Sequence, residues 1–458
     1  MTQTASITAT EIVAAVRSGA LSARTATEQA LERIDRLDGR LGAFQVVRTF
    51  AALREADAVD LRPERFSLPL AGLPIAIKDN VPVAGEPMRD GSAGSSSAPQ
   101  QRDHEVVRRL RAAGAVVVGI TRVPELCVFG ATDSVYGITH NPWRHDRTPG
   151  GSSGGAAAAV AAGIVPVAHG NDGMGSIRIP SACCGLVGIK PGRGVVPADL
   201  GNGSWFNMSE NGPLATTVAD CALVFSVLAG RPEFADVTEP GSLRIAISTK
   251  APSPGLSVNK YWAAGVRETA ELLADAGHRV TDATPAYGMG TIPAAASLWA
   301  AGTEMDARLL ADRSRTEPRT RRHAALGRAA MRLGATRDAR RNGFRGRAEH
   351  FFAEHDVLVT PTLAQWPLRS VAWGERGWLV NFVANARYAP FCAPWNLLGW
   401  PAMAVPAGLG PDGMPLSVQL VTRPGGEATL LGLALQLERL RPWPRTAPAP
   451  GRSGSGAH

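Results

Sequence analysis

Three serines, Ser152, Ser153 and Ser176, lie among glycines and alanines in the stretch GGSSGGAAAAVAAGIVPVAHGNDGMGSIR, residues 150–178. A serine hydroxyl can attack a carbonyl carbon, but it is a weak nucleophile until a base takes its proton. The one histidine of the stretch, His169, follows an apolar, strand-like segment, where we expect a structural side chain. No carboxylate–histidine pair in the stretch could serve as the base.

Two short motifs that contain these glycines fail on their context. Residues 150–154 fit G-x-S-x-G, the nucleophile turn of α/β-hydrolases, with Ser152 as nucleophile. That turn directly follows an apolar strand, whereas residues 140–149 read HNPWRHDRTP. A phosphate-binding loop is not indicated either, because no Lys-Ser or Lys-Thr follows the glycines.

A longer series of motifs explains the stretch better. Its centre is GGSSGG at 150–155, D-x-x-G-S-I-R-x-P at 172–180 and CGLVGIKP at 184–191. Further matching segments are GLPIAIKDN (72–80), RLRAAGAVVVGITRVPEL (109–126), GPLATTVADCALV (212–224), APWNLLGWPA (393–402) and GMPLSVQLV (413–421). In order and spacing these motifs resemble the amidase signature family of serine hydrolases. The resemblance covers most of residues 1–235 and 351–440.

The resemblance implies a catalytic set of two serines and a lysine. The family's nucleophile lies in the G-S-I-R element, which makes it Ser176 here. The lysine lies in I-K-D-N, which makes it Lys78. The second serine is Ser152, behind a cis peptide bond from Gly151. The implied enzyme is an amidohydrolase that needs no metal and no cofactor.

General physical chemistry is consistent with a lysine in this role. A lysine with a pKa of about 10.4 is almost entirely protonated at neutral pH and is then no base. Lys78 ends the apolar segment PIAI, and burial there would lower its pKa. Neutral Lys78 could then receive the Ser176 proton through the hydroxyl of Ser152, which both donates and accepts. Asp79 follows but would point to the opposite face of a strand.

The glycine-rich turn before the nucleophile is expected to supply the oxyanion hole. The candidate donors are the backbone N–H groups of Gly173, Met174, Gly175 and Ser176. The sequence departs from the commonest family pattern here, because Met174 replaces a glycine and Gly173 replaces a larger residue. A positive φ at Met174 would strain it by roughly 1–2 kcal/mol. Otherwise its N–H is retained and its side chain can line the pocket, which is the alternative we expect.

Three further residues are expected to support the site. Ser153 can serve as an ordinary turn or N-cap residue ahead of the helix expected at 154–163. Asp172 and Arg178 are expected to pair with each other or with the backbone, and so to hold the turn.

The substrate is expected to be a small-molecule amide that forms an acyl-Ser176 intermediate and yields a carboxylate and ammonia or an amine. Apolar side chains suggest an apolar or aromatic acyl group, and the candidate pocket residues are Met174, Trp205, Phe206, Met208 and Trp400. Buried core is the competing interpretation for each of them.

Three other functions stay open from the sequence. The same catalytic residues would serve a biosynthetic amidase or an acyl transferase. The A-subunit of a glutamine-dependent tRNA amidotransferase also resembles this family. In a different class, residues 308–347 carry thirteen arginines against three acidic residues and could bind an anionic partner. We expect a solvated helical face there, and no nucleic-acid binding.

The elements that position these residues read as an α/β fold. Strands are expected around 75–77, 115–120, 164–170, 243–248, 355–361 and 414–421, with helices at 104–113, 154–163 and 425–439. Thr8-x-x-Glu11 and Thr25-x-x-Glu28 both read as capping boxes of N-terminal helices. The family implies one α/β/α domain around a large, mixed, twisted sheet.

Along the chain we expect one domain over 1–440. It divides into N-terminal helices (1–62), the signature core (63–235), a variable helical substrate-side region (236–350) and a returning core (351–440). The tail 441–458 is rich in Pro, Gly and Ser and is expected to be disordered.

Composition places the protein in a broad class. There is no purely apolar run of about 18 residues and no signal-peptide pattern at the N-terminus. The five cysteines form no CxxC pair and are expected to be reduced and buried. We therefore expect a cytoplasmic enzyme without membrane contact, and a homodimer remains open.

Overall fold

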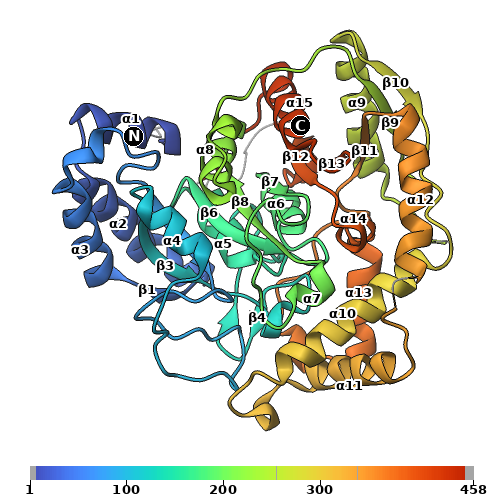
Figure 1. Cartoon of the computed structure of the whole chain (residues 1–458), viewed down its shortest axis with the longest axis horizontal. Coiled ribbons are helices and arrows are strands. Elements are labelled where there is room, and N and C mark those ends of the chain that lie inside the picture. Colours follow the sequence, from blue (N-terminus) through green and yellow to red (C-terminus); the bar gives the residue numbers. More distant parts are fainter. Residues whose placement is uncertain (1–6, 254, 338, 449–458) are drawn as a thin grey trace, which may run out of the picture.

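One mixed sheet of 11 strands crosses the molecule (Figure 1), in the order β1-β3-β2-β6-β8-β7-β12-β13-β11-β9-β10. The structure is a computed structural model, and it describes residues 7–253, 255–337 and 339–448. The strands are β1 (Phe44–Val47), β2 (Pro74–Lys78), β3 (Val116–Thr121), β6 (Val167–Asp172), β7 (Val187–Lys190), β8 (Glu210–Ala215), β9 (Arg244–Ile247), β10 (Arg279–Asp282), β11 (Val357–Pro361), β12 (Ala402–Leu409) and β13 (Pro415–Val421). A separate pair is formed by β4 (Asp133–Ser134) and β5 (Gly137–Ile138).

Parallel and antiparallel pairs alternate in blocks across the sheet. Strands β3, β2 and β6 are parallel, as are β11, β9 and β10. The strands between these blocks pair in antiparallel fashion. The expected large mixed sheet is therefore confirmed. The edge strand β10 is not predicted above, because its four residues are mostly polar and exposed.

Helices cover both faces of the sheet. They are α1 (Ala9–Ser18), α2 (Ala23–Leu41), α3 (Thr49–Asp60), α4 (Glu105–Ala112), α5 (Gly154–Ala161), α6 (Arg178–Cys184), α7 (Ser204–Asn207), α8 (Val218–Ala229), α9 (Lys260–Asp275), α10 (Thr291–Ala307), α11 (Pro318–Arg332), α12 (Ala339–Glu354), α13 (Trp378–Tyr388), α14 (Ala393–Leu398) and α15 (Glu427–Leu440). Short 3-10 turns lie at Pro63–Phe66, Glu125–Cys127, Pro232–Ala235, Arg313–Arg315 and Trp373–Glu375.

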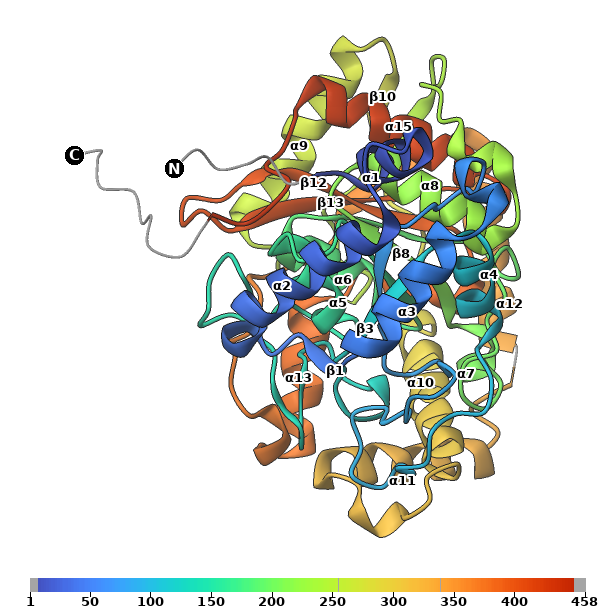
Figure 2. The same ribbon diagram turned by 90° about the vertical axis from the view of Figure 1, so that its left-hand side faces the viewer.

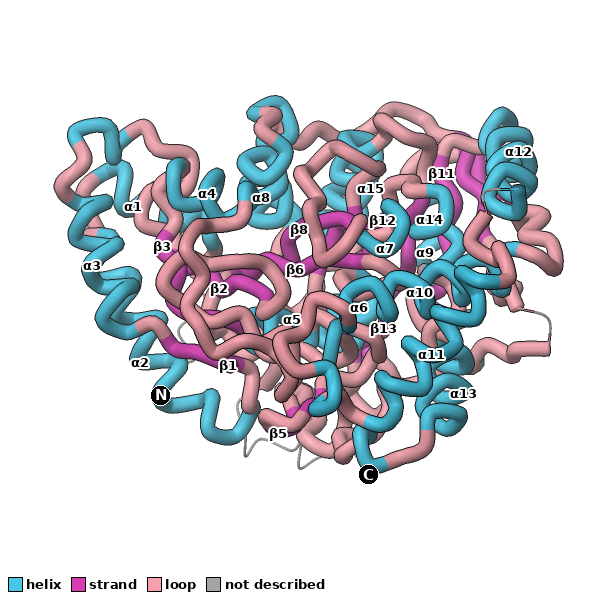
Figure 3. Tube along the Cα trace, turned by 60° about the horizontal axis from the view of Figure 1, so that its bottom comes forward, coloured by secondary structure: helices cyan, strands magenta, loops and turns pink. Residues whose placement is uncertain are grey.

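The layers are visible from two directions. Figure 2 shows α2 and α3 side by side at the flank that carries β1 and β3, and α1 near α8. Figure 3 shows α4, α8 and α15 on one side of the strands, and α5 and α6 on the other. The helices α10, α11 and α13 form a lobe beyond the sheet, in yellow and orange at the lower right of Figure 1.

The register of β2 against β6 creates the site. All residues of both strands are buried, and Ala76 pairs with Ala168 in parallel. The carboxyl ends of the two strands therefore meet at one edge, which is where side chains of parallel sheets gather. This brings Lys78 next to Asn171, although 93 residues separate them in sequence.

The two N-terminal capping predictions have different outcomes. The Thr8 box is confirmed, because the Thr8 side chain accepts from Glu11 N–H while the Glu11 carboxylate accepts from Thr8 N–H. The Thr25 box is wrong. Helix α2 begins at Ala23, and the Ser22 hydroxyl accepts from Thr25 N–H, so Ser22 is the N-cap.

The arginine-rich segment 308–347 is not simply a solvated face, and that expectation needs correction. Glu304 on α10, buried to about 1% side-chain exposure, receives ion pairs from Arg308, Arg313 and Arg328. Arg319 on α11 is fully buried. These arginines pair with carboxylates inside the protein, which weakens the hypothesis of an anionic partner.

The end of the described chain also departs from expectation. Residues 441–448 pack on the body: Trp443 donates to the Thr216 carbonyl, and Ala447 N–H donates to the Ala161 carbonyl. Disorder from residue 441 is therefore wrong for 441–448, while 449–458 lie outside the described residues. Across the described ranges, no helix is both long and apolar enough to cross a membrane.

Candidate active site

Lys78 lies at the end of β2 with no solvent exposure. Its Nζ atom lies 2.8 Å from Ser152 Oγ, 2.7 Å from Asn171 Oδ1 and 3.2 Å from the Asn171 carbonyl oxygen. The two oxygens of Asn171 can only accept, so they take two amine hydrogens. The third position of the nitrogen faces the Ser152 hydroxyl.

The surroundings of Lys78 disfavour its charged form. Burial lowers the pKa of the Lys78 ammonium below its ordinary value, and nearby Cys127, Asp172 and Asp90 oppose this only in part. Among the described residues no carboxylate forms an ion pair with Lys78. A neutral amine fits this geometry, because its lone pair can accept the Ser152 proton.

Ser152 follows a cis peptide bond from Gly151, as the family resemblance implies. The turn that carries it is packed closely, since a Cβ on Gly151 would lie 2.9 Å from the Phe129 carbonyl oxygen. Thr132 Oγ1 donates to the Gly150 carbonyl at 2.8 Å. Ser152 is thereby held, 1% exposed, beside Lys78.

Ser176 follows the turn after β6, and it is 7% exposed. Gly175 before it has φ 118°, a conformation that favours glycine. Ser152 and Ser176 line the same cavity. Within the described residues, the Ser176 hydroxyl has no hydrogen-bond partner, so the two serine hydroxyls are not bonded to each other in this structure.

The expected pairing of Asp172 with Arg178 is present. Arg178 Nε and Nη2 donate to the Asp172 carboxylate at 2.8 and 2.9 Å, and both side chains are fully buried. Burial opposes ionisation of Asp172, but the guanidinium outweighs it and holds the pKa of this carboxyl well below its usual range. Arg178 also donates to Gln419 on β13 and to Asn396 on α14, which ties the turn to the C-terminal part of the chain.

Ser153 anchors the site through hydrogen bonds other than a helix cap. It occupies the N-cap position of α5, but its side chain makes no capping bond. Its hydroxyl instead donates to the Asn171 carbonyl at 3.3 Å, and its N–H donates to the Ser176 carbonyl at 3.2 Å. Ser153 therefore links the turn that carries Ser152 to the end of β6 and to the Ser176 segment that follows it.

The oxyanion donors need one correction. Gly175 N–H already donates to Asp172 Oδ1 at 2.7 Å, so it is not free for a substrate oxygen. Across the described residues, the N–H groups of Gly173, Met174 and Ser176 have no intramolecular acceptor. The backbone of Met174 does not have a positive φ, so the alternative of a strained Met174 is wrong. Its side chain packs against the apolar cluster beside the site and does not line the cavity.

Comparison with known proteins agrees with this geometry. The Amidase family model matches residues 25–431. AmiB2 of Mycobacterium tuberculosis strain H37Rv is 45% identical over 442 residues, 94% of this chain and 95% of the relative. An acylamidase of Rhodococcus erythropolis is 34% identical over 97% of each chain. The chain belongs to the amidase signature family.

The structural comparison supports the same fold and chemistry. The solved structure of 6-aminohexanoate cyclic dimer hydrolase complexed with substrate matches with a TM-score of 0.86 and 28% identity, over 96% of this chain and 98% of that one. The fold is therefore that of an amidase, and the protein is a hydrolase of carbon–nitrogen amide bonds.

The cavity of this amidase has a volume of about 190 Å³ and reaches both serines. Of the five predicted pocket residues, only Trp205 lines it. Met208 is fully buried, and Trp400 packs against Trp395 and Phe352 and lines a different surface hollow. Phe206 is half-buried outside the cavity.

Several cavity residues were not predicted from the sequence. They include Asp90 from the loop after β2, Cys127 from the 3-10 turn after β3, Asn171 from β6, Leu200 from the segment before α7, and Asp306 from α10. Asn171 could have been found, because it is the last residue but one of a strand beside Lys78. The others depend on contacts between distant segments, for which the sequence has no local signal.

Trp205 accounts for the unusual Gly173 of this amidase. A Cβ on Gly173 would lie 2.8 Å from Trp205 Cε3, and one on Gly302 would lie 2.7 Å from Trp205 Cγ. The indole therefore occupies the space that a side chain at position 173 or 302 would need. Residues 204–207 are all left-handed, with φ between 47° and 58°, and this unusual turn delivers the indole to the cavity.

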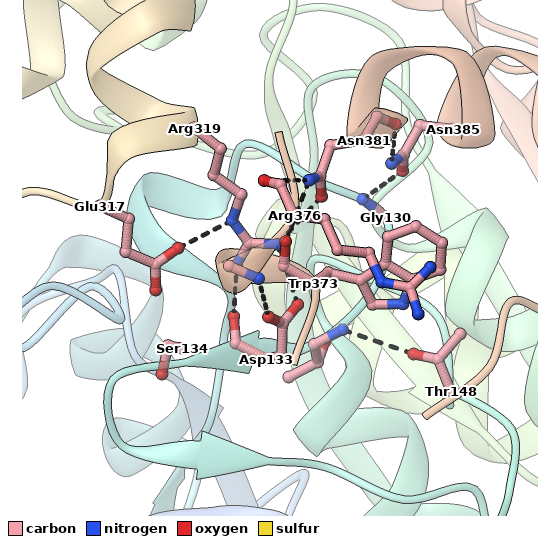
Figure 4. A network of polar contacts seen from close by, with 12 residues as sticks. Gly130, Asp133, Ser134, Thr148, Glu317, Arg319, Trp373, Arg376, Asn381 and Asn385 are labelled. Atoms are coloured by element: carbon pink, nitrogen blue, oxygen red, sulfur yellow. Dashed lines mark hydrogen bonds and ion pairs between the residues drawn. The ribbon is translucent and has the colours of Figure 1, made fainter. Parts of the chain in front are cut away.

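A buried network holds the loop behind Ser152 (Figure 4). Arg319 donates to Glu317 at 2.7 Å and to Asp133 Oδ1 at 3.1 Å, and it also donates to Asn381. From α13, Asn385 accepts from Gly130 N–H at 2.7 Å. The helical lobe is thereby fastened to the loop that contacts the Gly151–Ser152 bond.

Proposed function

We propose that Ser176 attacks the amide carbonyl carbon while its proton passes to Ser152 and the Ser152 proton passes to neutral Lys78. The N–H groups of Gly173, Met174 and Ser176 stabilise the oxyanion, each worth about 2.7–4 kcal/mol at the transition state. The carbon–nitrogen bond then breaks, and the relay returns a proton to the departing ammonia or amine. The acyl group remains on Ser176.

The second half of the reaction uses the same groups. Water enters after the amine leaves and donates a proton to Ser152, which passes its own proton to Lys78. The resulting hydroxide equivalent attacks the acyl carbon, and Ser176 leaves with the proton that the relay returns. The products are a carboxylic acid, which ionises in water, and the free enzyme.

The observation that supports this proposal most strongly is the position of Lys78. A buried amine that donates to both oxygens of Asn171 has its remaining position available to Ser152, whose Oγ lies 2.8 Å from Nζ. Burial favours its neutral form, so it can act as a base at neutral pH.

The second link of the relay forms with the substrate in place. Ser176 Oγ has no partner in this structure, and rotation of its side chain can aim the hydroxyl at either Ser152 or the substrate. Catalytic hydrogen bonds often tighten only in the complex. We propose that the Ser176–Ser152 bond belongs to that state.

The substrate is a small-molecule amide with an apolar part. Leu126, Leu200, Leu309 and Leu310 line the cavity together with Trp205. This arrangement supports the expected apolar acyl group, although mostly through residues other than those predicted. The enzyme acts in a reducing compartment, the cytoplasm, since all five cysteines are free and buried.

The test is a panel of aliphatic, aryl and amino-acid amides and anilides, assayed with the wild type, Ser176→Ala and Lys78→Met. Both variants are expected to lose activity by a factor of about 1,000 or more. Ser96→Ala is the matched control, because Ser96 also lines the cavity but contacts none of the three catalytic residues. Equal activity in the wild type and Ser176→Ala would overturn the nucleophile assignment.

Two further measurements complete the test. A fluorophosphonate probe should label Ser176, and labelling of another serine would contradict the proposal. Product analysis with water or hydroxylamine as acceptor separates hydrolysis from acyl transfer.

A further inference from the structure

The active-site cavity is lined by carboxyl groups and by no basic side chain. Among the residues described there, the ionisable carboxyl groups are Asp90 and Asp306, and no lysine, arginine or histidine lines the cavity. Lys78 lies behind Ser152 and does not line it. A cavity with two carboxyl groups and no cation of its own favours a positively charged ligand.

Asp306 lies at the C-terminal end of α10 and is half-buried. Trp205 Nε1 donates to its Oδ2 atom at 2.6 Å, and Asn202 N–H donates to its Oδ1 atom at 2.9 Å. Both donors are neutral, so the position of the carboxylate is fixed while its charge is left uncompensated. Burial raises the pKa of the Asp306 carboxyl to about 6.

Asp90 approaches the cavity from the loop after β2. Its φ of 49° is left-handed, and its Oδ1 atom accepts only a weak hydrogen bond from the Cys127 thiol at 3.6 Å. Burial raises the pKa of its carboxyl well above the ordinary value, and repulsion from Asp306 adds to this. Among the described residues Asp90 forms no ion pair, and the attraction of Lys78 opposes the rise of its pKa only in part.

Nearby arginines could have neutralised Asp306 but are bound elsewhere. Arg308 and Arg313, which follow it in the chain, both pair with Glu304. Glu304 lies on the same helix, half a turn before Asp306, and it is buried away from the cavity. Among the described residues, arginines pair with the buried carboxylate of Glu304 and none pairs with Asp306 at the cavity wall.

A second observation points to a ligand at the same place. Ser209 is 7% exposed and lines the cavity, and its hydroxyl has no hydrogen-bond partner among the described residues. A hydroxyl that opens onto the cavity without a partner in the protein can donate to or accept from a bound ligand. It lies next to Gly173, since a Cβ on Gly173 would meet Ser209 Oγ at 2.4 Å.

We infer that the amidase prefers amides whose acyl chain ends in a protonated amine, held by Asp306 and Asp90. The alkyl part would pack against the cavity leucines, with the amide carbonyl at Ser176. This inference rests on the proposed function, because it assumes that the acyl group of the substrate occupies this cavity. Asp90 and Asp306 are then specificity-determining residues of the reaction.

Three amides with the same four-methylene chain test it: 5-aminopentanamide, hexanamide and adipamate, which end in ammonium, methyl and carboxylate. At neutral pH we expect kcat/KM to follow that order. A hydrogen bond to a charged group corresponds to a factor of about 10 to 100 between the ammonium and methyl substrates. A ratio near one in the wild type would overturn the inference.

Variants locate the effect. Asp90→Asn keeps a residue type that tolerates the left-handed backbone, and it should lower the ammonium-to-methyl ratio about tenfold. Asp306→Asn should do the same but also weakens the Trp205 contact. Asp312→Asn is the control, since Asp312 is an exposed carboxylate outside the cavity. An unchanged ratio in both variants, or an equal drop in the control, would contradict the assignment.

The two proposals fail in different ways. Hexanamide hydrolysis that is lost in Ser176→Ala, together with equal rates for all three amides, would refute only the charge preference. Absence of any amide hydrolysis that depends on Ser176 would refute the proposed function, and the preference with it.

Discussion

Asn171 accepts two hydrogen bonds from the Lys78 nitrogen, through Oδ1 at 2.7 Å and through its carbonyl oxygen at 3.2 Å. Its side-chain nitrogen donates to Asn80 Oδ1 at 2.6 Å, which keeps the Oδ1 atom directed at Lys78. The partner is a neutral amide and not a carboxylate. It can therefore orient the amine without stabilising the ammonium form. Such stabilisation would keep Lys78 protonated and prevent it from acting as a base.

Asn171→Asp should convert this contact into an ion pair. An opposite charge in contact raises the pKa of a lysine by about 1–3 units, so the neutral base becomes available only at higher pH. We expect the acid limb of the kcat/KM profile to shift upward by that amount, with at least a tenfold loss at neutral pH. Recovery of activity at alkaline pH separates this effect from misfolding. An unshifted profile would mean that Lys78 is not the base.

Lys78→Met should change stability as well as activity. Because burial lowers the pKa of Lys78 in the folded state, the unfolded chain binds more protons between the folded and unfolded values. Lys78 therefore costs stability below its unfolded pKa of about 10.4, and this cost disappears as the pH rises toward that value. We expect the inactive variant to be more stable by about 1–3 kcal/mol at neutral pH.

Urea unfolding of the wild type and Lys78→Met at several pH values measures this difference. The difference in the free energy of unfolding should be largest at low pH. It should shrink as the pH approaches the pKa of the lysine in the unfolded chain. A difference that does not vary with pH would show that Lys78 titrates alike in both states.

Gly173→Ala should disturb the oxyanion turn through Trp205. The new Cβ would lie 2.4 Å from Ser209 Oγ and 2.8 Å from the indole, so the Ser209 side chain, the ring or the turn must move. We expect kcat/KM to fall about 10- to 100-fold, which corresponds to a full or partial loss of the stabilisation that one oxyanion donor provides. The double variant Gly173→Ala/Trp205→Leu should recover part of that loss. Strict additivity of the two effects would contradict the proposed contact.

The candidate catalytic residues could be named from the sequence because they lie in long, ordered motifs, and their catalytic roles stay a prediction. The same motifs also predicted the sheet that carries them, and local rules placed Thr8 correctly at a helix start. Local rules failed where two candidates competed, as for Ser22 and Thr25. The Ser22 hydroxyl, three residues before Thr25, accepts the hydrogen bond from Thr25 N–H and so caps helix α2.

The substrate side could not be predicted in the same way. Asp306 and Trp205 are 101 residues apart and lie on elements without a shared motif, so only the fold brings them together. The apolar side chains of Trp400 and Met208 suit a substrate pocket and a protein core equally well, so their residue types do not distinguish the two. Arg319 reads as one more surface cation until its buried partner Asp133 is known.

Arg319→Met should test the network behind the Ser152 turn. The change leaves Asp133 and Glu317 buried without their cation, which should lower the free energy of unfolding by about 3–5 kcal/mol at neutral pH. At lower pH the carboxyl groups take up protons, since burial already raises the pKa of Glu317 to about 7, so the loss should become smaller. Arg322→Met on the same helix removes an exposed cation and should change stability by no more than about 0.5 kcal/mol. Equal effects of the two substitutions in urea unfolding would refute a structural role for the buried arginine.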